Sequence, residues 1–196
     1  MKKYSLLFLT TSLLLALSYT CKKDNDGESL PPYTEVGANT FTFRVNGKVY
    51  EAEVGYLPVY PRIHIFYNHI DPYFHNDFRF EIEGNKIYLE DNKNVGITIS
   101  KMPKIGIYKL SDYGAPGTGS YAYYWDDKPI ELSYYTDNNH TGELIITRLD
   151  TVNHIISGRF NFKAKRYCFD RECTEIVSLD GQFDVRYKPN EGVNYY

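Results

Sequence analysis

Residues 40–54, with the sequence TFTFRVNGKVYEAEV, decide the predicted fold. Apolar and polar residues alternate on both sides of Asn46-Gly47. Successive side chains of a β-strand point to opposite faces, so this alternation predicts two half-buried strands. The dipeptide between them favours the two positive φ angles of a type I′ turn. The stretch therefore predicts a β-hairpin near the start of a folded domain.

The same period of two recurs downstream. Residues 78–89, FRFEIEGNKIYL, alternate around Gly84-Asn85, which we expect to turn the chain. Further strands are expected at 95–99, 121–125 and 130–135. Glycine and proline are too frequent between these segments for helices. We predict an all-β domain, an antiparallel β-sandwich, with a closed or partly open antiparallel β-barrel as the alternative.

Three C-terminal segments continue the strand pattern: GELIITRLDT at 142–151, IISGRFNFKA at 155–164 and GQFDV at 181–185. They resemble the closing strands of an uncharacterised family of Bacteroidota lipoproteins, a domain of unknown function. The shared pattern is G-x-L-x-I-T-x-L-D-T followed by I-S-G-x-F-x-F-x-A. The resemblance covers the C-terminal part of the chain and the N-terminal export region. It implies a fold and a cellular location, and it identifies no catalytic residue.

The N-terminus has the layout of a secretory signal peptide. A basic start, Lys2-Lys3, precedes an apolar run over residues 6–17. A membrane-spanning helix needs about 20 apolar residues, which is more than this run offers. We therefore expect residues 1–20 to be a signal peptide that is removed and takes no part in the fold.

The end of this segment and the residues after it resemble a second sorting signal. Residues 17–21, LSYTC, resemble the relaxed lipobox of Bacteroidota, and residues 22–26, KKDND, are similar to the tag that sends lipoproteins of that phylum to the cell surface. The resemblance implies that Cys21 is acylated, which anchors the protein in the cell envelope as a surface-exposed outer membrane lipoprotein. The alternative is an ordinary signal peptide followed by an incidental cysteine.

The remaining chain divides into two parts. Residues 21–39 are rich in glycine, proline and acidic side chains without periodicity, and we expect a lipidated N-terminus and a flexible tether. Residues 40–196 have the length of one domain. The chain has 20 tyrosines, and tyrosine favours strands and the half-buried rims of sheets. A single all-β domain is therefore expected from residue 40 onward.

Charge argues against one class of partner. Removal of residues 1–20 takes away Lys2 and Lys3, which leaves 20 basic against 25 acidic groups and a net charge of −5. A nucleic-acid-binding protein needs clustered lysine and arginine, and no such block follows the signal peptide. Nucleic acid is not an expected partner.

If Cys21 carries lipid, Cys168 and Cys173 are the only pair of cysteines left in an oxidising compartment. Four residues separate them, and a short loop between antiparallel strands brings facing Cβ atoms within the reach of a disulfide. We expect a disulfide that closes a hairpin. The alternative, a two-cysteine metal site, lacks the further ligands that zinc needs.

The densest cluster of titratable residues comprises His64, His69, Asp71, His75 and Asp77. These residue types suit a metal site or a general base, but their spacing matches no known catalytic motif. Motifs for an activated nucleophile or a phosphate-binding loop are also absent from the sequence. We expect a polar loop, no catalytic residue, no metal and no cofactor. The alternative is a hydrolase that uses acidic residues and His69 or His75.

Aromatic residues crowd the expected strand at 121–125. Alternation places Tyr121, Tyr123 and Trp125 on one face. An exposed face of this kind offers a flat platform that stacks on sugar rings, whereas a buried face is core. Both possibilities stay open.

A short motif on the last hairpin suggests a modification. Asp150-Thr151-Val152 resembles the acceptor of Bacteroidota O-glycosylation, so Thr151 is a candidate site, and an ordinary Asp-Thr turn is the alternative.

Together these features predict a surface-tethered module with a binding or structural role. Its partners are the membrane, through the lipid, and a glycan or another envelope protein.

Overall fold

The computed structural model describes residues 27–54, 63–70, 78–87, 92–101, 103–111, 119–127, 131–187 and 194–195. The described residues contain strands and no helix, which confirms the all-β prediction. The strands are β1 (Thr40–Val45), β2 (Lys48–Glu51), β3 (Glu53–Val54), β4 (Ile63–Ile70), β5 (Phe78–Ile87), β6 (Lys93–Ile99), β7 (Gly106–Leu110), β8 (Tyr121–Asp126), β9 (Leu132–Tyr135), β10 (Gly142–Asp150), β11 (Ile155–Arg166), β12 (Ile176–Arg186) and β13 (Asn194–Tyr195).

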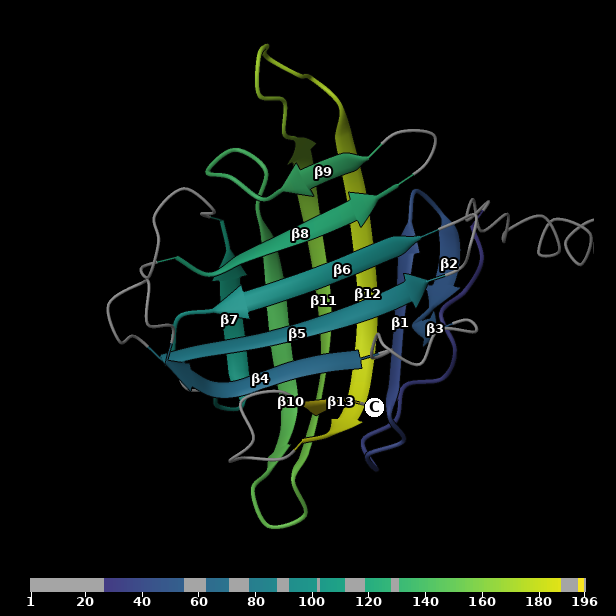
Figure 1. Cartoon of the computed structure of the whole chain (residues 1–196). Coiled ribbons are helices and arrows are strands. Elements are labelled where there is room, and N and C mark those ends of the chain that lie inside the picture. Colours follow the sequence, from purple (N-terminus) through teal and green to yellow (C-terminus); the bar gives the residue numbers. More distant parts are fainter. Residues whose placement is uncertain are drawn as a thin grey trace, which may run out of the picture.

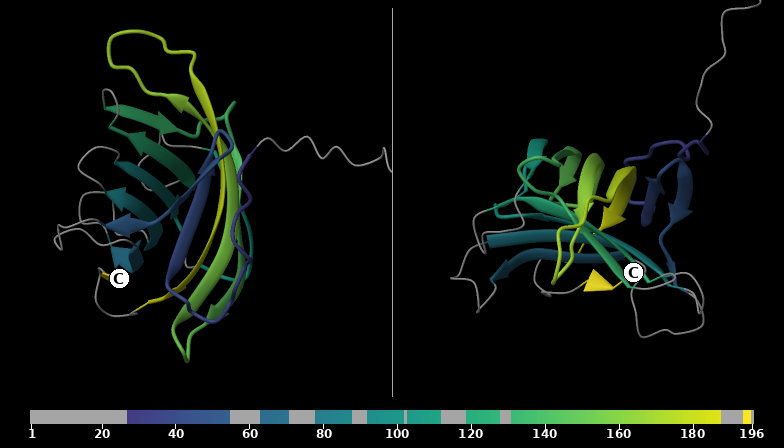
Figure 2. Two further views of the ribbon diagram at one scale, coloured as in Figure 1. Left: turned by 90° about the vertical axis from the view of Figure 1, so that its right-hand side faces the viewer. Right: turned by 90° about the horizontal axis from the view of Figure 1, so that it is seen from above.

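The strands form two layers that face each other. The front layer runs β13-β4-β5-β6-β8-β9, and the back layer contains β7, β10, β11, β12, β1 and β2. The strands of the two layers cross at a large angle (Figure 1). A side view shows the curved layers with the core between them (Figure 2). Sheets that cross in this way are joined at corners where the chain passes from one layer to the other.

Two such corners make the sheet nearly continuous. The last residues of β11, Lys165 and Arg166, pair with Tyr135 and Tyr134 of β9. On the other side, β3 follows β2 directly and pairs in parallel with the end of β5. The fold is therefore an antiparallel sheet that is nearly closed, and it fits both the sandwich and the partly open barrel that the sequence predicted.

The first hairpin forms as predicted. Asn46 and Gly47 have φ angles of 48° and 90°, and Val45 pairs with Lys48 across the turn. These positive φ angles are those that asparagine and glycine adopt most readily. Phe41 and Phe43 of β1 are completely buried, so the alternation was also interpreted correctly.

The turn predicted at Gly84-Asn85 is wrong, because β5 continues without interruption to Ile87. Gly84 faces the core, and a Cβ atom placed there would lie 2.1 Å from Cδ1 of Phe41. Glycine is needed here to admit the Phe41 ring rather than to reverse the chain. Phe41 in turn packs on Phe160 and Phe183, with ring centroids 5.5 and 6.2 Å away, at the centre of the core.

Residues 28–38, which the sequence predicted to be part of a flexible tether, lie along the outer side of the back layer (Figure 2). Their main anchor is the Asp184 carboxylate. It accepts hydrogen bonds from Oγ1 of Thr34 at 2.7 Å and from the backbone N–H of Gly37 at 2.8 Å, and also from Oγ of Ser157 at 2.8 Å. The backbone N–H groups of Val36 and Ala38 complete the set. A short polar segment without periodicity is thus ordered by one carboxylate.

Candidate functional site

Strand β8 presents its aromatic residues on two faces. Ala122 and Tyr124 point into the core and are buried. Tyr121, Tyr123 and Trp125 share the opposite, outer face of the front layer and are half-buried. The predicted alternation is therefore confirmed. These three side chains do not belong to the core, and the structure leaves them accessible on one side.

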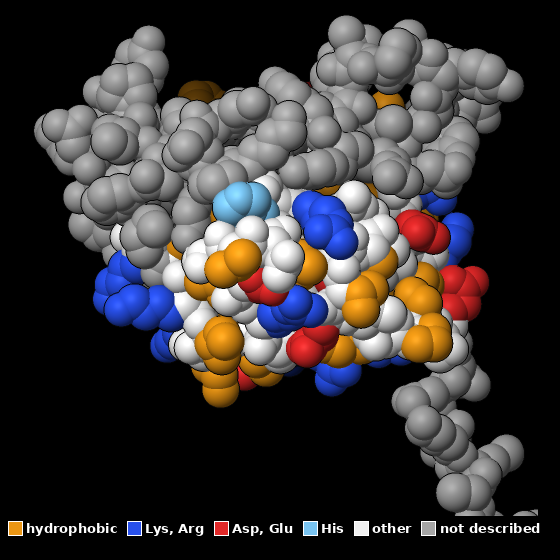
Figure 3. All heavy atoms as spheres, turned by 90° about the horizontal axis from the view of Figure 1, so that it is seen from below, with side chains coloured by type: hydrophobic (Ala, Val, Ile, Leu, Met, Phe, Trp, Pro, Cys, Tyr) orange, Lys and Arg blue, Asp and Glu red, His pale blue; other side chains and the backbone are white. Residues whose placement is uncertain are grey.

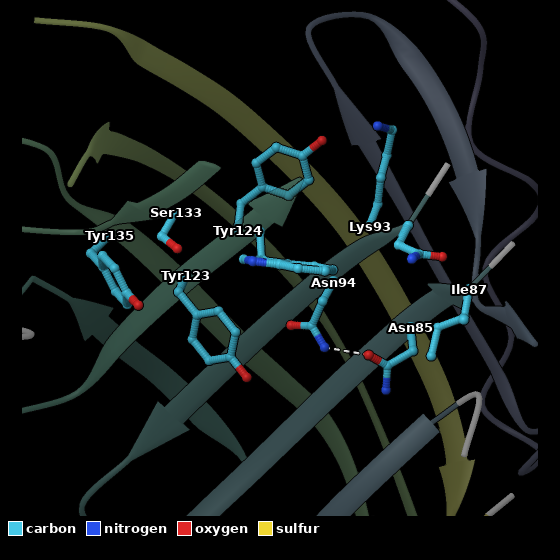
Figure 4. Close-up of a pocket in the computed structure, with 10 residues that line it drawn as sticks. Asn85, Ile87, Lys93, Asn94, Tyr123, Tyr124, Ser133 and Tyr135 are labelled. Carbon is cyan, nitrogen blue, oxygen red and sulfur yellow. Dashed lines mark hydrogen bonds between the residues drawn. The ribbon is translucent and has the colours of Figure 1, made fainter. Parts of the chain in front are cut away.

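The outer face of the front layer contains a depression of about 510 Å³. Four of its lining residues are aromatic, and three of these, Tyr123, Trp125 and Tyr135, are half-buried residues of the outer face. Asn85 and Asn94 contribute amide groups at the other end (Figure 4). The remaining lining residues are Ile87, Asn92, Lys93, Tyr124 and Ser133. Tyr121 does not line it, so only two of the three predicted platform residues belong to this site.

The register of four adjacent strands brings these residues together. Asn85 pairs with Asn94 across β5 and β6, and Asn94 pairs with Trp125 across β6 and β8. Tyr123 then pairs with Tyr135 on β9, with ring centroids 6.1 Å apart. Residues directly opposite each other on one face of a sheet are in contact, so pairing alone assembles the depression.

Tyr123 is held flat against the sheet. A Cβ atom at Gly96 would lie 2.2 Å from Cε1 of Tyr123, so the ring occupies the space that any other residue at position 96 would fill. The Tyr123 hydroxyl donates a hydrogen bond to Oε1 of Glu83. Glycine under an aromatic ring and a hydrogen bond at its far end together fix the orientation of the ring.

Trp125 and Asn94 supply polar atoms to the same site. Nε1 of Trp125 donates to Oε1 of Glu131 at 3.1 Å. The side-chain Nδ2 of Asn94 donates to Oδ1 of Asn85, which is drawn as the dashed line in Figure 4. Oδ1 of Asn94 is buried and accepts no hydrogen bond from the described residues. A buried acceptor without a donor is costly to the folded protein.

The sequence predicted neither asparagine as a site residue. Asn85 was placed in a turn, and Asn94 precedes the segment expected to be the next strand. Tyr135 was recognised only as part of a returning strand. The sequence did contain a signal for Asn85. The two-residue period of β5 continues through Gly84 and places Asn85 on the outer face.

The expected disulfide joins Cys168 to Cys173, with Cα atoms 6.0 Å apart. Its setting differs from the prediction, because both cysteines lie in the loop between β11 and β12 and do not face each other across paired strands. The bridge therefore closes the tip of the loop. Phe169, inside the bridged segment, is 94 % exposed.

Thr151 lies at the tip of the β10–β11 hairpin and is exposed. Asp150 fixes the turn, because its Oδ1 accepts hydrogen bonds from the backbone N–H groups of Val152 and Asn153. This hydrogen bonding accounts for aspartate in the motif, and O-glycosylation of Thr151 stays a prediction. Seen from this end, the molecule shows apolar side chains scattered among charged ones (Figure 3).

Several predicted features lie outside the described residues. They include Cys21, the signal peptide, and Asp71, His75 and Asp77. His64 and His69 belong to β4, but their side chains are not described. Within the described ranges, no three His, Cys, Asp or Glu side chains are grouped closely enough to hold a metal ion. The same ranges contain no helix that is long and apolar enough to cross a membrane.

The chain was compared with known proteins and protein families. No protein-family model matches the chain, and neither a curated protein nor a solved structure matches it.

Proposed function

We propose that the outer face of the front layer binds a glycan. The observation that carries the proposal is the convergence of Tyr123, Trp125 and Tyr135 with the amides of Asn85 and Asn94 around one depression of about 510 Å³. Ligand sites of this size are lined mainly by apolar and aromatic groups, with a few polar atoms that fix orientation. The faces of sugar rings are apolar and suit aromatic stacking, and their hydroxyl groups suit amides.

The charges around the depression favour a neutral sugar. Glu83 and Glu131 hold the outer ends of Tyr123 and Trp125 through hydrogen bonds. Lys93 also lines the depression, but its ammonium group is paired with Asp126, so the two carboxylates beside the aromatic rings disfavour a uronic acid or a sulfated sugar. The proposed ligand is therefore an uncharged polysaccharide or oligosaccharide.

Location is the second part of the proposal. A signal peptide over residues 1–20 and a lipid on Cys21 would place this face outside the cytoplasm, as in the Bacteroidota lipoproteins that the sequence resembles. The disulfide between Cys168 and Cys173 supports an oxidising compartment. Replacement of Cys21 by serine is expected to move the protein from the membrane fraction to the soluble fraction, and unchanged membrane association would contradict lipid anchoring.

Trp125 is the only tryptophan of the chain and lines the proposed site, so it reports on binding directly. The purified protein is titrated with a panel of neutral and sulfated polysaccharides while Trp125 emission is followed. A saturable shift with one or more neutral polysaccharides is the expected result. Absence of any saturable shift across the panel would contradict the proposal.

Two variants on the same strand separate binding from folding. Tyr123→Ala removes a ring that lines the depression, and Tyr121→Ala removes a ring from the same face outside it. Loss of one stacking ring is expected to weaken binding about fivefold, since aromatic contacts contribute about 1 kcal/mol each. Tyr121→Ala should bind as the original protein does. Thermal unfolding of both variants checks that each remains folded.

A different observation favours the second candidate, an envelope protein as partner. Phe169 is 94 % exposed and Tyr167 is 59 % exposed, and both lie in or beside the bridged loop that projects beyond the layers (Figure 1). Rigid, exposed aromatic side chains are typical anchors of protein interfaces. Phe169→Ser should abolish capture of a partner in cross-linking of intact cells, whereas Tyr123→Ala should leave that capture unchanged.

A further inference from the structure

The N-terminal segment enters the domain at the β1–β2 turn. The backbone N–H of Glu28 donates to the carbonyl oxygen of Gly47 at 2.9 Å, and the Glu28 carboxylate accepts a hydrogen bond from the backbone N–H of Val49 at 2.8 Å. Nη1 of Arg44 donates to the carbonyl oxygen of Glu28 at 3.1 Å. From Glu28 onward the segment is therefore attached to the domain.

This attachment shortens the tether that the sequence predicted. Residues 21–39 were expected to be free of the domain, but only six residues, 22–27, separate Cys21 from Glu28. An extended chain spans at most about 3.3–3.6 Å per residue, so six residues reach about 20 Å. With the proposed lipid on Cys21, the β1–β2 turn lies within about 20 Å of the membrane surface.

The bridged loop between β11 and β12 lies at the same end of the molecule as this turn. Val45 pairs with Leu179, and the backbone N–H of Asn46 donates to the carbonyl oxygen of Ser178 at 3.2 Å. Ser178 is five residues beyond Cys173, which corresponds to at most about 17 Å of extended strand. The loop projects beyond the layers at this end (Figure 1). Its projection is thus comparable to the reach of the linker.

Apolar side chains are exposed on this loop and at its root. Phe169 and Tyr167 project into solvent, and Ile176, the first residue of β12, is 50 % exposed. Residues 165–175 carry three basic and three acidic side chains, so the loop has no net charge. Exposed apolar groups rimmed by polar residues mark contact surfaces, and aromatic side chains favour the interface between a bilayer and water.

We propose that the bridged loop rests on the membrane that holds the lipid of Cys21, with Phe169 and Tyr167 in the interfacial layer of the bilayer. The inference rests on the proposed location of the protein. An envelope protein is the other occupant considered for Phe169. A small domain is about 30 Å across, which is more than the linker allows between the loop and the bilayer. The length of the linker therefore favours the lipid surface.

Docking of the loop also orients the glycan depression. The strands of the back layer run toward and away from the loop, whereas the depression opens on the outer face of the front layer, to the side of this axis (Figure 1). With the loop on the bilayer, the depression faces along the membrane surface. A polysaccharide then reaches the aromatic rings from the side, without obstruction by the bilayer.

The test uses the mature, lipidated protein, purified from the membrane fraction and reconstituted into vesicles of phosphatidylethanolamine and phosphatidylglycerol. Trp125→Phe removes the native reporter, and one new tryptophan is added to this background at a time. Phe169→Trp reports from the loop, and Val152→Trp reports from an exposed turn at the opposite end of β11. Phe169→Trp is expected to show blue-shifted emission that phospholipids with brominated acyl chains quench. Val152→Trp should emit as an indole in water and stay unquenched.

Two further measurements sharpen the expected result. Ile176→Trp, at the root of the loop, should be quenched less than Phe169→Trp, because it lies nearer the body of the domain. An increase in salt should leave the quenching of Phe169→Trp unchanged, because a loop without net charge docks through apolar contact and not through charge.

Flotation with the vesicles separates this inference from the proposed location. A protein that does not float lacks the lipid, which overturns the location and the docking together. A protein that floats while its Phe169→Trp variant emits as in water, unquenched, keeps the lipid anchor and overturns the docking alone. Blue-shifted emission in intact cells without quenching in vesicles also overturns the docking, and it assigns the loop to a protein partner.

Discussion

The outer faces of the two layers differ in what covers them. On the back layer, residues 28–38 lie across β12 and β11, so Asp184 is only 1 % exposed although it points away from the core. On the front layer, Tyr123 and Trp125 remain half-exposed around the depression. Both faces follow the same alternation along their strands. The comparison shows that a distant segment of chain decides whether an outward side chain becomes structural or stays available for a ligand.

The largest expected effect is on the covered face. Asp184→Asn turns one carboxylate oxygen into an N–H donor that faces other donors, among them the N–H groups of Val36 and Gly37. Buried groups left without a partner cost about 1–3 kcal/mol, and charge-assisted bonds are lost as well, so a loss of about 3 kcal/mol is expected in urea unfolding. Asp180→Asn, a part-exposed residue of the same strand that pairs with Arg44, should cost less than about 1 kcal/mol.

The same carboxylate makes this face sensitive to acid. Burial raises the pKa of Asp184, but hydrogen bonds from Thr34, Ser157 and the backbone outweigh burial, so its pKa lies below the ordinary value. A lowered pKa contributes stability that is present above the unfolded value of about 3.9 and is lost as pH falls through the folded value. Unfolding followed from pH 6 down to pH 2 should therefore show a steep loss. In Asp184→Asn the loss should be shallower; an unchanged slope would assign acid sensitivity to other carboxylates.

A smaller effect is expected where the segment crosses β11. The guanidinium of Arg159 lies 4.2 Å from the centroid of the Tyr33 ring. An exposed cation–π contact contributes about 0.5–1 kcal/mol, so Arg159→Ala should lower the unfolding free energy by about that amount. Lys163→Ala, on the same face of the same strand, serves as the matched control and should change stability by less than about 0.5 kcal/mol.

The smallest effect on stability, and the most informative, concerns Gly96 on the open face. The three atoms nearest to a methyl group there all belong to the far end of the Tyr123 side chain, which can swing away into solvent. We expect Gly96→Ala to change the unfolding free energy by less than about 0.5 kcal/mol and yet to abolish the response of Trp125 to glycan. If the open face is a binding surface, Gly96→Ala must abolish the response of Trp125 to glycan and leave the unfolding free energy nearly unchanged.

Gly84→Ala provides the reference for that experiment. It adds the same methyl group to the neighbouring strand, but on the inner face against the immobile Phe41 ring. Overpacking of this kind costs about 2 kcal/mol. If Gly96→Ala were equally costly, Tyr123 would be a structural residue and the contrast between the two faces would disappear.

The sequence predicted those elements whose cause is local. The Asn46-Gly47 hairpin and the alternation of β8 depend on residues within a few positions of one another, and both are confirmed. Gly84 was misjudged because its reason is a ring on another strand, and the segment at residues 28–38 was misjudged because its anchor, Asp184, lies near the end of the chain. Spacing along the sequence carries no information about such contacts.

The candidate site divides in the same way. Tyr123 and Trp125 were found from alternation on one strand, whereas Asn85, Asn94 and Tyr135 join them only through the registers of β5, β6 and β9. A register between strands is fixed by which residues fill the core. It cannot be predicted before the order of the strands is known.

The pairing of β1 with β12 has a consequence for how the chain reaches this structure. Thr40 lies opposite Asp184, so the first strand of the domain, which pairs with β2 on one side, finds its other partner only after nearly the whole chain has been synthesised. Sheets closed by such distant contacts fold slowly, over milliseconds to seconds, because a long loop must be ordered before the contact forms. Until then Phe41 has no core to enter.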